Sequence, residues 1–146
     1  MELPLDAEML IPHRKPMCLI DSLNVSDGKS GSASARFPSD CPFVIDQKGT
    51  IERLALLELT AQTYAASKGY EDLADGIDSS QGYLVGISNA VCYGDAYAGQ
   101  DLRITVESEE AFDAFHLAVG EVWHHEDLLM KAKLKIWISS EETQQT

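Results

Sequence analysis

The sequence predicts an α+β fold in which an antiparallel sheet of about five or six strands curls round one long buried helix. One stretch, Ile51–Gly69, is apolar on nearly every side, as expected of a helix that is enclosed. Several other stretches alternate apolar and polar residues, which is typical of strands with one covered face. Because these strands lie before and after the helix, wrapping the sheet round it is the most economical packing.

Length and composition fit one domain, residues 1–146. The chain has 146 residues, of which 45% are hydrophobic, enough for a core. Its formal net charge of -13 repels phosphate backbones and anionic membranes, so no nucleic-acid or membrane partner is expected. The N-terminus lacks a basic and apolar leader, and the dispersed cysteines suit a reducing compartment, so a cytoplasmic location is expected. No cysteine and histidine pair has zinc spacing, and neither a metal nor another cofactor is expected.

The first part of the chain predicts a lead-in followed by two strands. Two prolines bracket residues 13–15, and the apolar run Met17–Val25 ends at Asp27-Gly28, which indicates a strand and its turn. Ser30–Pro38 alternates small residues and predicts the second strand.

The helix follows an irregular segment. Thr50 is the predicted N-cap, and Lys68-Gly69 is the predicted C-terminal stop. Residues 70–81 are then expected to form a loop.

Four more strands are predicted after this loop, the last two as a hairpin joined through His124–Asp127. In the final strand three lysines alternate with apolar residues: Lys131, Lys133 and Lys135. One face of the sheet is therefore expected to be exposed to solvent and the other to be packed against the core.

Glu58 interrupts the apolar helix near its middle. The residues three, four or seven positions away share its face: Leu54, Ala55, Ala61, Gln62 and Ala65. Burial among them would favour the protonated carboxyl, which could act as a general acid or serve as a base. The structural alternative is a buried glutamate satisfied by a backbone amide or by Gln62.

Three segments of the chain carry a family resemblance. Ile11–Leu23 opens with Pro-His-Arg-x-Pro and continues through an apolar run to an aspartate, and Leu56–Ala66 holds a glutamate followed by Ala-Gln. Tyr83–Glu107 is a strand, a turn and a further strand start. In this order they resemble the beta-hydroxyacyl-carrier-protein dehydratases, a hot-dog family, over residues 9–138. The resemblance implies a hot-dog fold that acts on acyl thioesters.

One feature of that family is missing. In the dehydratases a histidine in a Gly-His-Phe-Pro stretch precedes the helix and is thought to remove the proton beside the thioester carbonyl. Here Cys41–Glu52 contains no histidine, and none lies between His13 and His116. The chain thus resembles a divergent subgroup, the predicted carrier-protein dehydratases found with aryl-polyene pathways, which share the Pro-His-x-x-Pro-Met opening.

The resemblance implies that Glu58 is catalytic, with Gln62 as a hydrogen-bond partner for Glu58 or for a substrate carbonyl. His13 is the candidate base, although a structural role, bonding a backbone carbonyl, is the alternative. Near the helix start, unpaired amides are expected to form an oxyanion hole for the thioester carbonyl: those of Gly49, Thr50 and Ile51.

Three functions stay open at this point. The chain could dehydrate a 3-hydroxyacyl thioester, hydrolyse an acyl thioester through Glu58, or act as a degenerate subunit that binds an acyl chain or pairs with an active partner. The implied partners are an acyl thioester on acyl carrier protein or coenzyme A and, because related proteins share sites between subunits, a second copy in a homodimer or dimer of dimers. Four cations are expected to receive the acidic carrier or its phosphate: Arg14, Lys15, Lys48 and Arg53.

Overall fold

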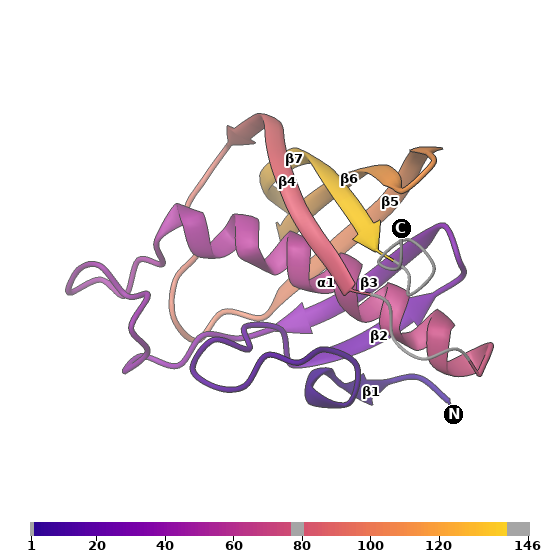
Figure 1. Ribbon diagram of the computed structural model, residues 1–146. Coiled ribbons are helices and arrows are strands. Elements are labelled where there is room, and N and C mark those ends of the chain that lie inside the picture. The colour runs from indigo at the N-terminus through magenta and orange to yellow at the C-terminus, as the bar shows by residue number, and fades with distance from the viewer. Residues whose placement is uncertain (1, 77–80, 140–146) are drawn as a thin grey trace.

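The computed structural model describes residues 2–76 and 81–139 and shows one long helix lying across a curved antiparallel sheet (Figure 1). The helix α1 spans Arg53–Ala74, and a short 3-10 helix, η1, spans Ala7–Met9. The strands are β1 (Leu5–Asp6), β2 (Ser22–Ser26), β3 (Ser30–Ala35), β4 (Gln81–Cys92), β5 (Leu102–Phe112), β6 (Phe115–His124) and β7 (Asp127–Ser139). The α+β arrangement predicted from the sequence is confirmed, with β1 as an additional two-residue strand.

The sheet has the strand order β1-β2-β3-β5-β6-β7-β4, and all its pairs are antiparallel. Strands that follow one another in the chain are neighbours in the sheet except at two places: between β3 and β4, where α1 intervenes, and between β4 and β5. The helix leaves β3 and delivers the chain to β4 at the opposite edge, so β4 pairs with β7 alone. The helix is therefore the crossover element of the fold and lies over the whole sheet.

The core lies between α1 and the concave face of the sheet. Leu56 and Leu59 of the helix are fully buried, as is Ile104 of β5. The helix packs directly on the backbone of β6, because a Cβ added at Gly120 would lie 2.6 Å from the Cβ of Thr60. Within the described residues, no helix is long and apolar enough to cross a membrane.

The helix begins and ends later than predicted. Thr50 and Ile51 lie in isolated β-bridges to Tyr97 and Val44, so Glu52 takes the N-cap position. The helix continues past Gly69 to Ala74, and the left-handed residue that follows its end is Gly76, with φ of 67°. The loop predicted for residues 70–81 is thus helical at its start, extended at Gln81, and includes residues 77–80, which lie outside the described ones.

The predicted long helix packed in a curved sheet is confirmed, and most of its central residues are buried, but a row on the side away from the sheet stays open. Leu54 is 67% exposed and Ala65 is also exposed. A further difference concerns the segment Leu10–Ile20, here called the lead-in segment. β2 starts at Ser22 rather than at Met17, because the end of the lead-in segment is bonded to the helix instead of to the sheet.

Candidate functional site

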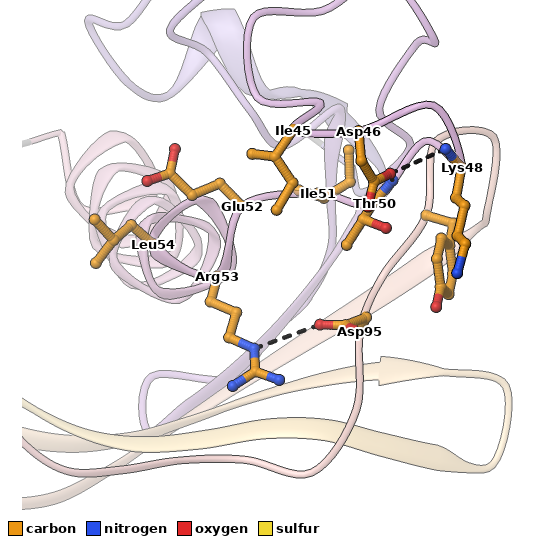
Figure 2. Close-up of a pocket in the computed structure, with 10 residues that line it drawn as sticks. Ile45, Asp46, Lys48, Thr50, Ile51, Glu52, Arg53, Leu54 and Asp95 are labelled. Carbon is orange, nitrogen blue, oxygen red and sulfur yellow. Dashed lines mark hydrogen bonds and ion pairs between the residues drawn. The ribbon is translucent and has the colours of Figure 1, made fainter.

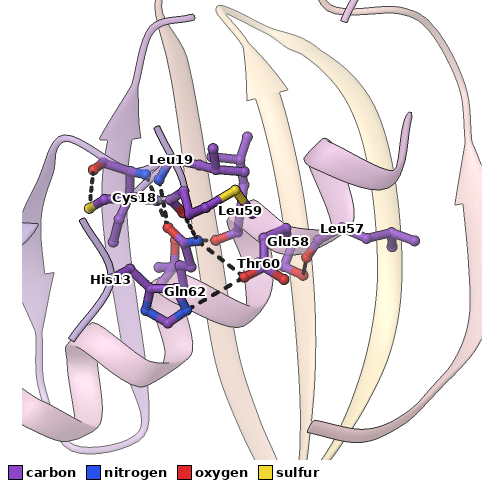
Figure 3. A network of polar contacts seen from close by, with 11 residues as sticks. His13, Cys18, Leu19, Leu57, Glu58, Leu59, Thr60 and Gln62 are labelled. Atoms are coloured by element: carbon purple, nitrogen blue, oxygen red, sulfur yellow. Dashed lines mark hydrogen bonds and ion pairs between the residues drawn. The ribbon is translucent and has the colours of Figure 1, made fainter. Parts of the chain in front are cut away.

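Glu58 lies on the side of α1 that the sheet leaves open (Figure 3). Its side chain is 38% exposed, and Leu54, one turn earlier on the same face, is more exposed still. Glu58 is therefore half-buried rather than buried, because Leu54 and Ala65 on its face are exposed whereas Ala55 and Gln62 are buried. Its side chain is partly open to solvent.

Gln62 holds this carboxylate in place. It is 1% exposed, and its Nε2 donates to Glu58 Oε1 at 3.1 Å and to the Met17 carbonyl at 2.8 Å. Its Oε1 accepts hydrogen bonds from the amides of Leu19 at 2.8 Å and Ile20 at 3.4 Å. Both amide protons are used within the chain, so of the two partners expected for Gln62 the structure shows Glu58 and leaves no proton for a substrate carbonyl.

His13 approaches the same carboxylate from the lead-in segment. Its Nε2 lies 3.8 Å from Glu58 Oε1, and its side chain is 35% exposed (Figure 3). Its Nδ1 is buried and has no hydrogen-bond partner among the described residues. The described residues therefore give no support to the alternative in which the His13 ring donates a hydrogen bond to a backbone carbonyl. An imidazole beside a carboxylate gives this surface two groups capable of proton transfer.

Arg14 turns back on its own segment. Its Nη1 donates to the carbonyl of Ile11 at 3.0 Å and to that of His13 at 2.8 Å. Arg53 is also engaged, because its Nε lies 3.4 Å from Asp95 Oδ1. Two of the four cations expected to receive an acidic carrier are thus bonded within the chain, and a contact between Arg14 and substrate or carrier stays a prediction.

The backbone amides before the helix already have acceptors. Gly49 donates to the carbonyl of Asp46 at 3.2 Å, Thr50 to Asp46 Oδ1 at 3.0 Å, and Ile51 to the carbonyl of Ala96 at 2.9 Å. The bond from Thr50 is also the main reason why the pKa of Asp46 is lowered. The expectation of unpaired amides at residues 49–51 is therefore wrong, because the loop folds onto Asp46 and Ala96.

An open groove of about 560 Å³ lies at the start of α1 (Figure 2). It is lined by Ile45, Asp46, Lys48, Thr50, Ile51, Glu52, Arg53, Leu54, Asp95 and Tyr97. Two cations among these residues are opposed by three carboxylates, so the lining does not favour a phosphate. Neither Glu58 nor His13 lines this groove, and Leu54, one helical turn before Glu58, is the lining residue on the same helix face.

The far wall of this groove, formed by Asp95 and Tyr97, is not predicted from the sequence. Asp95 and Tyr97 reach the helix start through the Arg53–Asp95 ion pair and the Thr50–Tyr97 bridge, which join residues far apart in the chain. A sequence pattern carries no signal for such contacts. The one hint was the opposite charge of Arg53 and Asp95.

A curved antiparallel sheet packed on one long helix is the hot-dog fold. Together with the family match that follows, it supports a function related to acyl thioesters. Residues 5–146 match the profile of the ApeP-like family, described as ApeP dehydratase. The chain therefore belongs to the ApeP-like dehydratase family, and the resemblance to hot-dog dehydratases is confirmed. Comparison with curated proteins gave no significant match.

Solved structures share the fold at low sequence identity. The dehydratase heterocomplex ApeI:P from Xenorhabdus doucetiae superposes with a TM-score of 0.84 at 19% identity, covering 99% of this chain and 96% of that one. A hypothetical thioesterase with coenzyme A from Streptococcus pneumoniae gives 0.64 at 11% identity, covering 81% and 84%. The uncharacterized protein PH1136 from Pyrococcus horikoshii gives 0.71 at 9% identity, covering 96% and 97%. At these identities the likeness establishes the fold alone.

Proposed function

We propose that this chain dehydrates a 3-hydroxyacyl thioester, with Glu58 as the acid and His13 as the base. The observation that carries the proposal is the arrangement of three side chains, in which Gln62 fixes Glu58 and His13 faces it at 3.8 Å. Membership of the ApeP-like dehydratase family supports a lyase rather than a hydrolase.

The carboxylate is suited to the proposed role because its two oxygens differ. Oε1 faces Gln62 and His13, whereas Oε2 has no hydrogen-bond partner in the part of the chain that the structure describes. One oxygen thus orients the group and the other is available to a substrate hydroxyl. The exposure of Glu58 provides access for that hydroxyl.

The reaction balances with these two groups alone. His13 takes the proton from the carbon beside the thioester carbonyl, and the electron pair forms the new carbon–carbon double bond. The bond from the next carbon to its hydroxyl oxygen breaks, and Glu58 donates a proton to that oxygen, which departs as water. An enoyl thioester remains, and proton exchange with solvent restores the two side chains.

Mass spectrometry of carrier-protein thioesters tests this proposal. We expect the purified chain to interconvert 3-hydroxyacyl and enoyl thioesters, a change of one water. Glu58→Gln should abolish the change, and His13→Gln should reduce it by about a hundredfold or more. Glu110→Gln, an exposed glutamate of β5 outside the site, is the matched control and should retain full activity.

Each other outcome points to a different function. Release of free thiol that depends on Glu58 would replace dehydration with thioester hydrolysis. Activity that survives Glu58→Gln would remove this residue from the mechanism. Thioesters that bind but stay unchanged with the purified chain would show that it is not a catalyst by itself and would favour a binding subunit.

We further propose that a second copy of this chain completes the site. The edge of β4 that faces away from β7 pairs with no described strand, and residues of this strand and its end are exposed: Ile87, Val91 and Tyr93. The open row of α1 at Leu54 adds apolar surface. A sheet that continues through paired β4 edges would satisfy the free backbone groups and cover this surface.

Native mass spectrometry of the purified chain tests this assembly. We expect a dimer or a dimer of dimers, and Val91→Lys on the exposed edge should shift it toward monomer. A monomer at micromolar concentration would rule out the homodimer. Dimers that form only with a different hot-dog chain would replace it with a mixed pair, the kind of assembly named for the Xenorhabdus doucetiae structure.

A further inference from the structure

Gly69 lies in a helical position where its residue type needs a reason. Glycine is the poorest helix former after proline, and α1 continues for five residues beyond this one, to Ala74. The sequence alone suggested a helix stop at Gly69, which the structure overturns. A need for unusual backbone angles at a helix end therefore does not explain why residue 69 is a glycine.

The main chain of the lead-in segment occupies the space that a side chain at residue 69 would need. A Cβ added at Gly69 would lie 2.4 Å from the carbonyl oxygen of Leu10 and 3.4 Å from its carbonyl carbon. Both atoms belong to the backbone, so a side-chain rotation cannot relieve the clash. Gly69 thus lets the lead-in segment cross the helix in direct contact.

The lead-in segment also carries His13, and few interactions of the imidazole ring itself hold it in place. Its Nδ1 lacks a hydrogen-bond partner among the described residues, and its Nε2 faces only Glu58. The position of the ring is therefore set by the backbone on either side of it. After His13, that backbone is tied to the helix by Gln62. Before it, Ile11 is buried in the core, and Leu10 contacts the helix at Gly69.

Only two residues separate Leu10, which contacts Gly69, from His13, which faces Glu58. Arg14 stiffens the segment further by bonding the carbonyls of Ile11 and His13. A displacement at Leu10 is therefore transmitted to the histidine.

We propose that Gly69 is a positioning residue for the Glu58–His13 pair, acting through the main chain of Leu10. The proposal rests on the function proposed above for that pair. Gly69 is remote from the pair along the helix and has no side chain, so it does not touch the reacting atoms. It allows the lead-in segment to lie where His13 reaches Glu58.

Gly69→Ala tests the proposal by adding one methyl group at the contact. We expect kcat to fall by about tenfold or more with KM changed less than about twofold, because misplacement of a proton-transfer group affects the chemical step. Ala74→Ser, which makes a similarly small change at the exposed end of the same helix, is the control and should leave kcat unchanged. Thermal unfolding of each variant verifies that it is folded.

Histidine-selective ¹⁵N NMR gives a second readout that does not require activity. The signals of the His13 ring, assigned with His13→Gln, should shift in Gly69→Ala, while those of His124 and His125 should not. Unchanged His13 signals in a folded Gly69→Ala protein would overturn the positioning role, whatever the activity. Shifted His13 signals with unchanged kcat would also overturn it, whereas an inactive wild type with shifted signals would retain the positioning of the ring and reject the proposed function.

Discussion

Gln62 lies one helical turn beyond Glu58, and its Nε2 is 3.1 Å from Glu58 Oε1. The same side chain binds three backbone groups of the lead-in segment, those of Met17, Leu19 and Ile20. A single buried amide thus joins the helix, the carboxylate and a segment more than forty positions away in the sequence.

Gln62→Leu should destabilise the protein by about 2–3 kcal/mol, because it leaves buried backbone donors and an acceptor without partners. Urea unfolding measures this change in the free energy of unfolding. Gln100→Leu is the control, since Gln100 accepts one exposed bond from Tyr97, and it should cost less than about 1 kcal/mol. Equal losses for the two variants would contradict the importance of the buried network.

Gly120→Ala should destabilise the protein by about 1–3 kcal/mol, because the added Cβ meets Thr60 on α1. The helix would have to move away from β6. The melting temperature of this variant is compared with that of Gly86→Ala, where a Cβ meets nothing within 4 Å. If both substitutions lower the melting temperature alike, the close helix–sheet approach at Gly120 is not the cause.

Tyr64→Phe should leave stability near neutral pH unchanged or slightly higher. The Tyr64 hydroxyl is buried near Ser108 but has no hydrogen-bond partner of good geometry among the described residues. A poorly aligned contact with Ser108 contributes little to stability. A loss of stability in Tyr64→Phe would show that the hydroxyl has a partner after all.

The same variant should change the alkaline limb of the stability curve. Burial raises the pKa of Tyr64 to about 12, above the value near 10 expected when the chain is unfolded. The unfolded state therefore loses this proton first, and stability falls as pH rises from about 10 to about 12. Tyr64→Phe should reduce this fall, while Tyr93→Phe, at an exposed site, should not.

His116 should make the protein less stable on mild acidification. Burial, aided by nearby Lys68, lowers the pKa of this histidine in the folded chain. Below its ordinary value of about 6.5 the unfolded state binds the proton more readily, so stability falls as pH decreases through this region. Urea midpoints at pH 7.5 and pH 5 should differ less for His116→Gln than for wild type, and an equal difference would contradict this assignment.

The strands and the existence of the helix were predictable because they depend on local pattern. The alternation of Lys131, Lys133 and Lys135 with apolar residues marks β7 correctly, and His124–Asp127 forms the predicted hairpin turn. The alternation of polar and apolar residues in the last strand can be read without knowing which strands lie beside it. The same holds for the apolar helix, whose length was nevertheless underestimated.

The failures concern contacts between distant segments. Gly69 resembles a helix stop in the sequence, and only the position of Leu10 explains it differently. Apolar neighbours suggested that Glu58 is buried, but no sequence pattern tells which side of the helix the sheet covers. The amides of residues 49–51 appeared free because their acceptors include Ala96, far along the chain.

The position of β4 has a consequence for synthesis on the ribosome. This strand follows the helix directly but has only β7, the last strand, as its partner within the described sheet, and Gln81 pairs with Ser139. Because chains are made from the N-terminus, β4 and the helix beside it stay without this partner until nearly the whole chain has emerged. A nascent chain halted before β7 therefore leaves the long strand β4 unpaired, and an unpaired strand edge is a site of aggregation against which chaperones protect.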